Sequence, residues 1–442
     1  MEADPALGFL KQAAAEVGVR AWVVGGYVRD RLLGRERPEL DVVVEDGDAL
    51  LLAEHFARLT GARRPALFPR FGTAQVTWQG RQIEFVTARA ESYLPDSRKP
   101  EVRRASLRED LLRRDFTVNA LLMDLDGNVL DPVGGLRDLE RRVLRTPREP
   151  LETFNDDPLR MLRAIRLAVQ LGFVLDPGLL PAMRRLRERA RPPVLSVERI
   201  NEELRKMLLS AQPDRAIQLL DAGGLLEVLL PEVYACHGVE QRGWHTRDVF
   251  GHTLEAVRHT EPDLVLRLAA LFHDVGKPRT ATPDGAFHGH DEVGSQMAAE
   301  ALARLRFSNA DVESVSRLVR LHLRPVFYSS EWGDGAVRRL ARDAGPLLWK
   351  LLALARADIA ASAYPHGEKI DELERRLRAV LAETPSRMRV PVSGRDIMGV
   401  RGIGPGPEVG RLKERLDELV MEGTLPPDRQ ALLEYLAAHP DL

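Results

Sequence analysis

Residues 23–34 read Val23-Val24-Gly25-Gly26-Tyr27-Val28-Arg29-Asp30-Arg31-Leu32-Leu33-Gly34. The apolar residues before the two glycines are typical of a buried strand, and the residues after them are typical of a helix. Such a junction presents backbone N–H groups and a helix N-terminus to an anion, which suits a triphosphate. We therefore predict a phosphate-binding turn at Gly25 and Gly26, with Arg29 near the phosphates in the first turn of the helix.

An acidic pair lies at the start of the next predicted strand. Glu39 and Asp41 flank Leu40 ahead of three valines, and strand alternation places both carboxylates on one face. In two-metal phosphoryl transfer such a pair binds Mg²⁺. Glu84, in a later apolar run, is a candidate third ligand. The alternative is a pair of solvated loop residues, and the neighbouring glycine turn favours the metal site.

Composition limits the class of protein. The chain has 442 residues, 44% hydrophobic and 29% charged, which suggests two to four globular domains. Cys236 is the only cysteine, so intramolecular disulfides and thiolate metal cages are excluded. Glu2 and Asp4 are unlike a signal sequence, and no apolar run of about 18 residues occurs, so we expect a cytoplasmic protein without membrane association.

Charge alone gives little support for nucleic-acid binding. The formal net charge is −2, whereas proteins that bind phosphate backbones usually carry a basic surplus. Arginine is nevertheless concentrated in residues 98–114, 137–148 and 184–191. Such clusters are more often solvated helix faces than RNA contacts, so they indicate RNA binding only when a catalytic motif lies nearby.

Two further motifs connect the chain to a known family. Residues 113–120 read Arg-Arg-Asp-Phe-Thr-Val-Asn-Ala, and residues 156–166 read Asp-Asp-Pro-Leu-Arg-Met-Leu-Arg-Ala-Ile-Arg. With the glycine turn and the acidic pair, they resemble the class II tRNA nucleotidyltransferases and bacterial poly(A) polymerases of the polymerase-β superfamily. The motifs lie in the right order and spacing over about half the chain. The family's first metal ligand is usually Asp, whereas this chain has Glu39.

The resemblance implies template-independent addition of CMP and AMP from CTP and ATP to the 3′ end of tRNA, with Mg²⁺ as cofactor. The partner it implies is the tRNA acceptor end, and no protein partner is implied. Arg114 would contact the sugar and phosphates of the nucleotide, while Asp157 and Arg160 would select the base. We expect Asp157 and Arg160 on one helix face, because they lie three residues apart.

Arg163 and Arg166 extend the same predicted helical stripe by further turns, and they would face triphosphate or primer phosphates. A carboxylate beside a guanidinium can hydrogen-bond the Watson–Crick edge of C or A, so side chains could replace a template. The alternative is a solvated helical ion pair worth about 0.3–0.5 kcal/mol.

A second group of polar residues follows in the helical part of the chain. Histidine and aspartate recur on separate apolar segments, at His252, His273, Asp274, His290, His322 and Asp358. This arrangement resembles the HD phosphohydrolase superfamily, which implies His252, His273, Asp274 and Asp358 as core ligands. His290 and His322 could complete a two-metal site. Without thiolates, the ligand set suits Mn²⁺, Fe²⁺, Ni²⁺ or Zn²⁺, with Mg²⁺ as a further candidate.

By analogy with that superfamily, the substrates of the second site would be phosphomonoesters or 2′,3′-cyclic phosphates, including those on damaged tRNA ends. A metal site of this type activates water for attack on phosphorus. Lys277, close to the His273-Asp274 pair, is a candidate phosphate contact.

The predicted fold is an α/β head of polymerase-β nucleotidyltransferase type, followed by an all-α neck and body, a helical HD domain and a helical tail. Short β-branched runs up to about residue 125 indicate the head, and apolar spacing of three and four residues after about residue 147 indicates the helices. The predicted domains are residues 1–146, 147–240, 241–363 and 364–442.

Several alternatives stay open. Members of the family add the whole CCA, only CC, only A, or a poly(A) tail. Residues 89–102 resemble the flexible loop that CC-only enzymes lack, which argues against CC-only addition. A second class of hypothesis makes the HD site the main activity and the head an RNA-binding module. Stringent-response synthetase-hydrolases also pair these domain types, but in the opposite order.

Overall fold

The structure is a computed structural model that describes residues 4–36, 39–92, 101–104, 106–241, 246–363, 367–382, 390–421 and 424–440. The chain divides into two compact units, Met1–Leu229 and Leu230–Leu442. In the described ranges no helix combines the length and apolar character that a membrane crossing requires.

The first unit contains a seven-stranded sheet with the strand order β3-β4-β5-β2-β1-β8-β9. The strands are β1 (Ala21–Val24), β2 (Leu40–Val44), β3 (Ala66–Phe68), β4 (Thr73–Trp78), β5 (Arg81–Thr87), β8 (Leu122–Met123) and β9 (Val129–Leu130). β2 and β5 are parallel, and the other neighbours are antiparallel. This sheet confirms the predicted α/β head.

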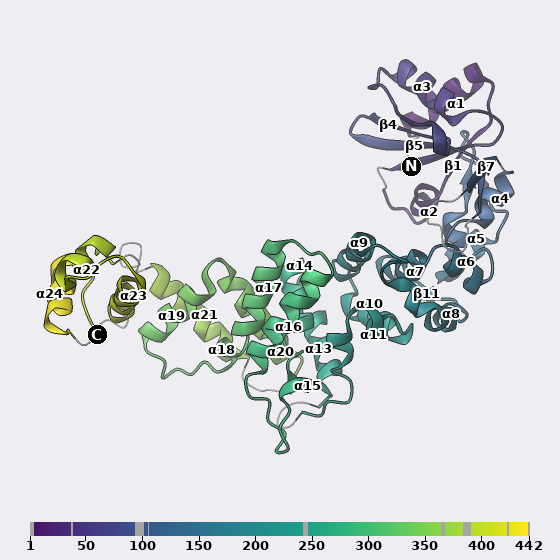
Figure 1. The fold of residues 1–442 in the computed structure, drawn as a ribbon. Coiled ribbons are helices and arrows are strands. Elements are labelled where there is room, and N and C mark those ends of the chain that lie inside the picture. Colours follow the sequence, from purple (N-terminus) through teal and green to yellow (C-terminus); the bar gives the residue numbers. More distant parts are fainter. Residues whose placement is uncertain are drawn as a thin grey trace. The chain divides into compact units, whose positions relative to one another are not determined.

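Helices α1 (Pro5–Val17) and α3 (Ala49–Thr60) cover one face of the sheet (Figure 1). The ring of Phe56 on α3 lies 5.7 Å from that of Phe85 and 6.0 Å from that of Trp78, measured between centroids. Burial along β4 and β5 alternates, so the residues between these core positions point to the opposite face. Polar side chains, among them Asp41 and Glu84, therefore occupy that second face.

Helices complete the first unit. They are α2 (Gly26–Leu32), η1 (Pro69–Phe71), α4 (Leu107–Leu112), η2 (Thr117–Asn119), α5 (Gly135–Arg141), α6 (Pro150–Asp156), α7 (Leu159–Leu171), α8 (Leu179–Leu186), η3 (Arg187–Ala190), α9 (Val197–Leu208), α10 (Pro213–Ala222) and α11 (Leu225–Leu229). Two small sheets pair β10 (Val143–Leu144) with β11 (Val174–Leu175) and β6 (Arg89–Ser92) with β7 (Glu101–Arg104). The middle of the predicted flexible loop, residues 93–100, lies outside the described residues.

The described part of the second unit is helical, as predicted. Its elements before the tail are α12 (Pro231–Tyr234), α13 (Val249–Arg258), α14 (Leu264–Phe272), α15 (Lys277–Thr280), α16 (His290–Arg304), α17 (Asn309–Leu321), α18 (Leu323–Val326), α19 (Asp334–Ala344), η4 (Gly345–Leu347), α20 (Leu348–Ala360) and α21 (Glu368–Ala382). α16 packs along α17, and α14 lies against both α13 and α17, so the helices form one bundle.

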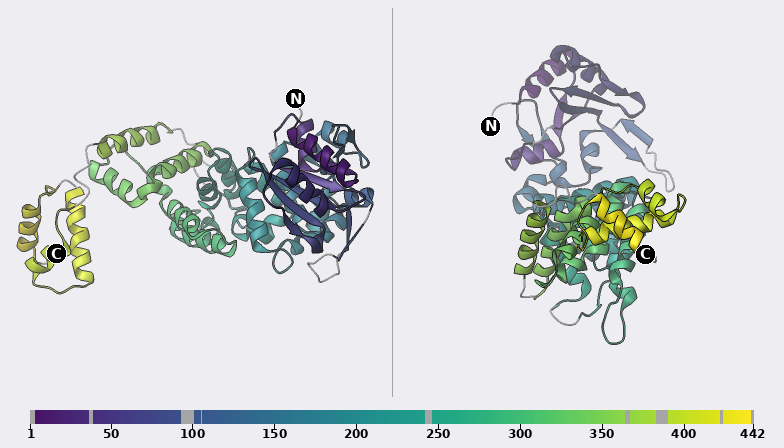
Figure 2. Two further views of the ribbon diagram at one scale, coloured as in Figure 1. Left: turned by 90° about the horizontal axis from the view of Figure 1, so that it is seen from above. Right: turned by 90° about the vertical axis from the view of Figure 1, so that its left-hand side faces the viewer.

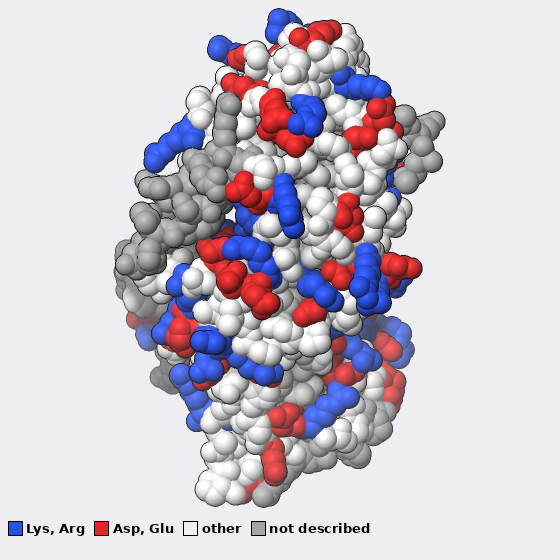
Figure 3. All heavy atoms as spheres, turned by 90° about the vertical axis from the view of Figure 1, so that its right-hand side faces the viewer, with Lys and Arg blue, Asp and Glu red and all other residues white. Residues whose placement is uncertain are grey.

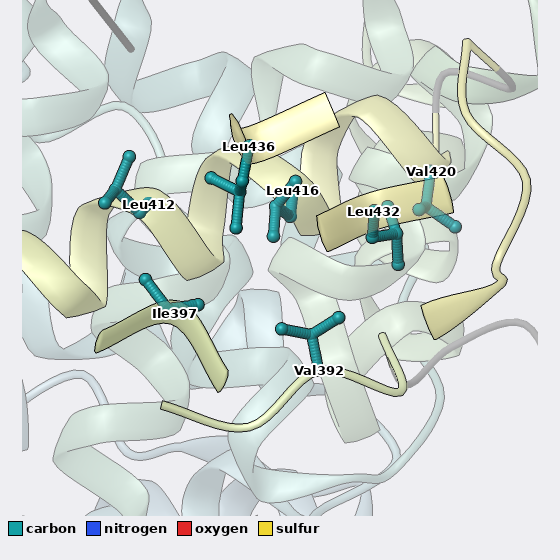
Figure 4. Close-up of a cluster of buried hydrophobic side chains, with 7 residues drawn as sticks. All are labelled: Val392, Ile397, Leu412, Leu416, Val420, Leu432 and Leu436. Atoms are coloured by element: carbon teal, nitrogen blue, oxygen red, sulfur yellow. The ribbon is translucent and has the colours of Figure 1, made fainter. Parts of the chain in front are cut away.

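The tail helices α22 (Gly394–Arg401), α23 (Pro407–Met421) and α24 (Arg429–Ala438) form a small cluster of their own (Figure 2, yellow). Seven buried apolar side chains converge between them (Figure 4). They are Val392, Ile397, Leu412, Leu416, Val420, Leu432 and Leu436. A capping box between Ser393 and Asp396 fixes the start of α22.

Candidate active sites

The glycine turn at the end of β1 lies directly against one of the predicted metal-binding carboxylates. Gly25 has a φ of 81°, a left-handed value that side chains other than glycine rarely adopt. A Cβ atom at this position would lie 2.9 Å from Oδ2 of Asp41 and 3.6 Å from Nη1 of Arg114. Only a residue without a side chain therefore allows the turn, the carboxylate and the guanidinium to meet. The structure thus brings three predicted site residues together.

The sheet register brings a second carboxylate to Asp41. Asp41 pairs with Val24 of β1 on one side and with Glu84 of β5 on the other. Directly paired residues point to the same face of a sheet, so Asp41 and Glu84 project together. Glu39 immediately precedes β2 and is exposed, as is Glu84, while Asp41 is half-buried. Three carboxylates of this kind are the hard oxygen donors that Mg²⁺ prefers.

Arg29 occupies the first half of α2, as predicted, but its guanidinium is engaged inside the protein. Nε and Nη2 donate to the two carboxylate oxygens of Asp30 at 2.8 and 2.7 Å, and Nη1 donates to Oδ1 of Asn119 at 2.6 Å. The side chain is buried. These contacts tie the helix behind the glycine turn to η2, so they support a positioning role for Arg29.

The motif of residues 113–120 is organised by a buried carboxylate that the sequence did not single out. Asp110 accepts hydrogen bonds from Arg113 at 2.5 and 3.0 Å and from Arg114 at 3.1 and 3.3 Å. The charges of both guanidiniums lower the pKa of Asp110 against the opposing effect of burial. Asp110 precedes the two arginines by three and four residues, and this helical spacing would have predicted the ion pairs from the sequence.

Asp157 corrects one detail of the sequence analysis. It does not lie on a helix face with Arg160, because α6 ends at Asp156 and α7 begins only at Leu159. Pro158 explains the break, since a residue before proline is driven toward extended backbone, and Asp157 has φ −140° and ψ 102°. Its carboxylate accepts from the backbone N–H of Leu159 and from Arg199 of α9, each at 3.1 Å.

The three arginines of α7 have different surroundings. Arg160 is buried and donates to the carbonyl oxygens of Thr153 at 3.2 Å and Arg113 at 2.5 Å. Arg163 donates to Oδ2 of Asp115 at 2.9 and 2.6 Å, and Arg166 donates to Oε2 of Glu203 at 2.6 Å. Arg160 thereby links α7 to the motif that contains Arg114. Arg163 and Arg166 each face a carboxylate, and nothing in these contacts places a phosphate beside them.

Asp115 is the acidic centre of this network. It also accepts from Nδ2 of Asn119 at 3.1 Å and from the backbone N–H of Phe116 at 2.9 Å. Burial disfavours its charged form, but the charge of Arg163 and the bonds from Asn119 and Arg163 outweigh burial and lower the pKa of Asp115 to about 2. The carboxylate is therefore ionised at neutral pH and holds α7 against η2.

The second unit brings all six predicted histidine and aspartate ligands together from five helical segments. His252 lies in α13 and Asp358 in α20, His273 and Asp274 directly follow α14, His290 begins α16, and His322 directly follows α17. All six are buried to nine-tenths or nearly so in the interior of the bundle. Their ligand atoms fall into two groups within 4.8 Å, formed by His252, His273 and Asp274 and by Asp274, His290 and His322.

Asp274 is shared by the two groups. Its Oδ2 lies 3.2 Å from Nε2 of His273 and 3.7 Å from Nε2 of His252, whereas its Oδ1 lies 3.4 Å from Nε2 of His290 and 3.8 Å from Nε2 of His322. Asp358 completes the first group, with Oδ1 3.0 Å from Nε2 of His252. With one carboxylate oxygen facing each group, Asp274 would be able to contribute a ligand to a divalent cation in either group.

The imidazole rings are oriented for metal binding. The Nδ1 atoms of His273, His290 and His322 lie 2.8, 2.7 and 2.6 Å from the carbonyl oxygens of Ala270, Phe287 and Val319. A proton on each Nδ1 leaves Nε2 as the ligand atom, directed at the centre. Burial lowers the pKa of His322 to about 4, so this ring is neutral at pH 7. Nε2 of His290 is buried without a hydrogen-bond partner among the described residues, as expected of a metal ligand.

A cavity of about 510 Å³ opens onto this centre. Asp274, His290, His322 and Asp358 contribute to its polar part, and Phe287, Leu323, Val326, Phe327 and Ile359 form its apolar part. Nζ of Lys277 lies at the cavity, 2.6 Å from Oδ2 of Asp274 and 2.6 Å from Oε1 of Gln241. A cation beside this cluster of carboxylates and imidazoles can contact a phosphate group.

The fold and the two sites define the class: a nucleotidyl-transfer head in one unit and a histidine–aspartate metal centre in the other. Comparison with known families follows the same division. Residues 21–145 match the poly A polymerase head domain, residues 172–236 the probable RNA and SrmB-binding site of polymerase A, and residues 242–379 the HD domain. Both catalytic domain types use divalent metal ions.

Curated relatives extend the match over most of the chain. The A-adding tRNA nucleotidyltransferase of Deinococcus radiodurans is 36% identical over 416 residues, which are 90% of this chain and 91% of the relative. The CC-adding enzyme of Thermus thermophilus is 38% identical over 416 residues, which are 91% and 90% of the two chains. This chain belongs to the tRNA nucleotidyltransferase family, and it is a nucleotidyltransferase.

Solved structures agree with this assignment. The Bacillus stearothermophilus CCA-adding enzyme in complex with CTP superposes with a TM-score of 0.68 at 25% identity, and the match covers 99% of this chain and 98% of that enzyme. The Thermotoga maritima CCA-adding enzyme complexed with tRNA shares the fold, with a TM-score of 0.59 at 23% identity over 98% and 96% of the two chains.

The surface charge agrees with the small net charge. On the face shown in Figure 3, acidic and basic side chains of the described residues are interspersed. Binding of a polyanion to such a surface depends on local arginines rather than on a field of one sign.

Proposed function

We propose that this chain adds CMP and AMP from CTP and ATP to the 3′ end of tRNA. The observation that carries the proposal is the meeting of the Gly25 turn, Asp41 and Arg114, where no side chain larger than hydrogen fits at position 25. A backbone turn, a carboxylate and a guanidinium at one point are what transfer from a nucleoside triphosphate requires. The names of the relatives and of the CTP-bound neighbour support the choice of substrates.

In this proposal Glu39 and Asp41 hold Mg²⁺, with Glu84 as a further carboxylate beside Asp41. The metal, when bound, lowers the pKa of the attacking 3′ hydroxyl and offsets charge on the leaving pyrophosphate. Gly25 and Gly26 offer backbone amides to the triphosphate, and Arg114 is held by Asp110 at the same place. Positioning and electrostatics of this kind account for most catalysis of phosphoryl transfer.

Base selection is assigned to Asp157 and Arg160. Arg160 is fixed by two carbonyl oxygens, so its planar group is oriented before a nucleotide arrives. Asp157 contacts Arg199 through an ion pair whose arginine side chain is 50% exposed, and such pairs contribute about 0–1 kcal/mol. A cytosine amino group could therefore replace Arg199 at low cost. Arg163 and Arg166 are assigned to supporting this surface through Asp115 and Glu203.

The experiment uses tRNAs that end before the first C, after the second C and after the final A. Each is incubated with the protein, Mg²⁺ and CTP or ATP, separately and together. We expect the shortest tRNA to grow by CCA. Growth only of the tRNA that lacks its final A would make the protein an A-adding enzyme, and growth that stops after CC would make it a CC-adding enzyme. Absence of any extension would refute the proposal.

A second candidate function is phosphoester hydrolysis at the HD site. We infer it from Asp274, whose two oxygens face separate histidine groups, and from Lys277, which lines the cavity beside Asp274. The residues fit two divalent cations, which supply an activated water when bound. Lys277 would hold the phosphate of the substrate, and the apolar wall would hold the group attached to it. Phosphomonoesters and 2′,3′-cyclic phosphates are the proposed substrate class.

Metal analysis tests this second function. The protein is loaded with Mn²⁺ or Ni²⁺ in an Asp41→Asn background, which removes a ligand of the proposed metal site in the first unit, and bound metal is counted with and without Asp274→Asn or His322→Ala. We expect two ions in the background alone, fewer than one with D274N because both groups lose a ligand, and about one with H322A. His259→Ala, a change at an exposed histidine paired with Glu255, is the matched control and should keep both ions. Equal loss in D274N and H322A would contradict a bridging role for Asp274.

A further inference from the structure

A second cavity, of about 260 Å³, lies on the sheet of the first unit. It is lined by Phe68, Phe71, Thr73, Gln75 and Glu84. The two phenylalanine residues are 46% and 45% exposed, although large aromatic side chains usually lie inside a folded protein. Two exposed rings beside polar side chains are the usual composition of a surface on which a nucleobase stacks.

The register connects this cavity to the catalytic carboxylate. Asp41 pairs with Glu84, Glu84 pairs with Gln75, and two positions along the same strands Thr73 pairs with Phe68. Paired residues share a sheet face, and so do residues two apart on one strand. Asp41, Glu84, Gln75, Thr73 and Phe68 therefore all project from the face opposite α3. The cavity begins one strand away from Asp41 and extends toward the edge strand β3.

The strand order places the cavity on one side of Asp41 and the phosphate-binding groups on the other. β5, β4 and β3 follow β2 in one direction, whereas β1, with the Gly25 turn at its end, follows β2 in the opposite direction. The incoming triphosphate is assigned to the Gly25 side. The attacking hydroxyl must also lie at Asp41, so the nucleoside that carries it occupies the remaining side, along β5 and β4.

We propose that the cavity binds the terminal nucleobase of the tRNA primer by stacking on Phe68 and Phe71; this rests on the proposed nucleotide addition. Gln75 and Thr73 line the same cavity; the amide of Gln75 donates to Oε1 of Gln82 at 2.9 Å, and the hydroxyl of Thr73 donates to the carbonyl oxygen of Phe71 at 3.2 Å. The guanidinium of Arg70 stands 6.0 Å from the centroid of the Phe71 ring, where it can contact a backbone phosphate. Stacking tolerates any base, which suits a site that receives a different 3′ residue after each addition.

The test compares Phe68→Leu and Phe71→Leu with Phe68→Tyr and Phe71→Tyr in the full chain. The leucine variants keep the apolar character but lose the ring, whereas the tyrosine variants keep the ring. We expect KM for tRNA to rise about 5- to 100-fold in the leucine variants and to change little in the tyrosine variants. KM for CTP and ATP should stay within about twofold. Leu51→Ala, at a 47% exposed position of α3, is the matched surface control.

A direct binding measurement separates this proposal from the function on which it rests. A tRNA end carrying 2-aminopurine as its last base is titrated with protein in the absence of nucleotide. Quenching by wild type and by F68Y, but not by F68L, is expected whether or not nucleotides are added. Equal quenching by F68L would overturn the stacking site. A rise in KM for CTP or ATP with unchanged KM for tRNA would assign the cavity to the incoming base and also overturn the proposal.

Discussion

Asp41 has little freedom of position. It lies under the Gly25 turn, where even a methyl group would approach Oδ2 to 2.9 Å, and its strand neighbour is Glu84. Glu39, by contrast, is an exposed residue ahead of the strand. A longer side chain at position 39 can adjust its reach in solvent, whereas a longer one at position 41 would move the carboxylate relative to the Gly25 turn and Glu84.

We therefore expect position 39 to tolerate a change in side-chain length and position 41 not to tolerate one. Asp41→Glu and Asp41→Asn should each lower kcat for nucleotide addition by at least about 100-fold, since displacements of about 1 Å are already this costly. Glu39→Asp should retain activity within about tenfold of wild type. Single-turnover extension of tRNA at saturating nucleotide measures both effects. If E39D and D41E were equally damaging, the two carboxylates would be equally constrained, and the contrast between the two positions would be wrong.

Asp115 provides a prediction about acid stability. Its pKa is lowered to about 2 by Arg163 and Asn119 against the effect of burial, so its charged form stabilises the folded state. This stabilisation is complete above the ordinary value of 3.8 and is lost as the pH falls toward 2. Asp115→Asn should lower the free energy of unfolding by about 2 kcal/mol at pH 7.

Urea unfolding at pH 7, 4 and 3 measures this effect. The difference between wild type and D115N should shrink as the pH falls below 4, because Asp115 becomes protonated in the unfolded wild-type chain while it stays charged in the folded one. Glu140→Gln, at an exposed carboxylate of α5, serves as the control for loss of a negative charge. A difference that stayed constant between pH 7 and 3 would show that Asp115 acts through packing rather than charge.

At the scale of elements, the strands and helices of both units were predictable from periodicity, and their pairing was not. Alternation indicates that Glu84 lies on a strand, but only the parallel pairing of β2 with β5 places it beside Asp41. The pairing of β5 with β4 and of β4 with β3 then brings Phe68 to the same side of the sheet, although it is more than 25 residues from Asp41 in the sequence. The three-residue spacing predicts Asp157 and Arg160 on one helix face, but Pro158 drives Asp157 toward extended backbone.

The six candidate ligands of the HD site were easier to single out from the sequence, because histidine and aspartate recur there on separate helical segments. The sequence could not predict that these residues form two groups, since this depends on which oxygen of Asp274 faces which histidine. The sequence also contained no sign that position 276 must be glycine. It lies between α14 and α15, and a Cβ there would lie 2.1 Å from the carbonyl oxygen of His290.

Gly276→Ala should therefore force the start of α16 away from α14. We expect the variant to lose metal from the HD site and to be destabilised by about 1–3 kcal/mol, the usual cost of overpacking. Gly410→Ala is the control: at this helical glycine an added methyl group would meet none of the described residues within 4 Å, so the change should stabilise the protein slightly. Metal content and thermal unfolding are measured for both variants. Full metal binding by G276A would show that the contact between residue 276 and the His290 carbonyl can relax without disturbing the HD site.

At the scale of the whole molecule, each unit contains one of the two candidate sites. The carboxylates, the glycine turn and α7 lie in the first unit, and the histidine–aspartate centre with its cavity lies in the second. The tail adds a core of its own, whose seven buried side chains come only from residues after 390. The sequence predicted this helical tail but indicated no function for it, since apolar spacing reports packing and not chemistry.

The two sites differ in ligand chemistry, which predicts different metal requirements within one protein. The first site offers only carboxylates, which suit Mg²⁺, whereas the second offers four imidazoles and two carboxylates, which suit Mn²⁺, Ni²⁺, Fe²⁺ or Zn²⁺. After chelation and dialysis, both nucleotide addition and phosphoester hydrolysis should be lost. Mg²⁺ alone should restore nucleotide addition, and hydrolysis should return only when Mn²⁺ or Ni²⁺ is supplied.

Variants of the two sites show which site is responsible for each restored activity. D274N should recover nucleotide addition with Mg²⁺ as wild type does but no hydrolysis with any metal, and D41N should show the reverse. Recovery of hydrolysis with Mg²⁺ alone would mean that Asp274 and Asp358 dominate binding at the second site and that the histidines act mainly on the substrate. Loss of nucleotide addition in D274N would show that the two sites depend on each other, because no residue of the first site is changed in that variant.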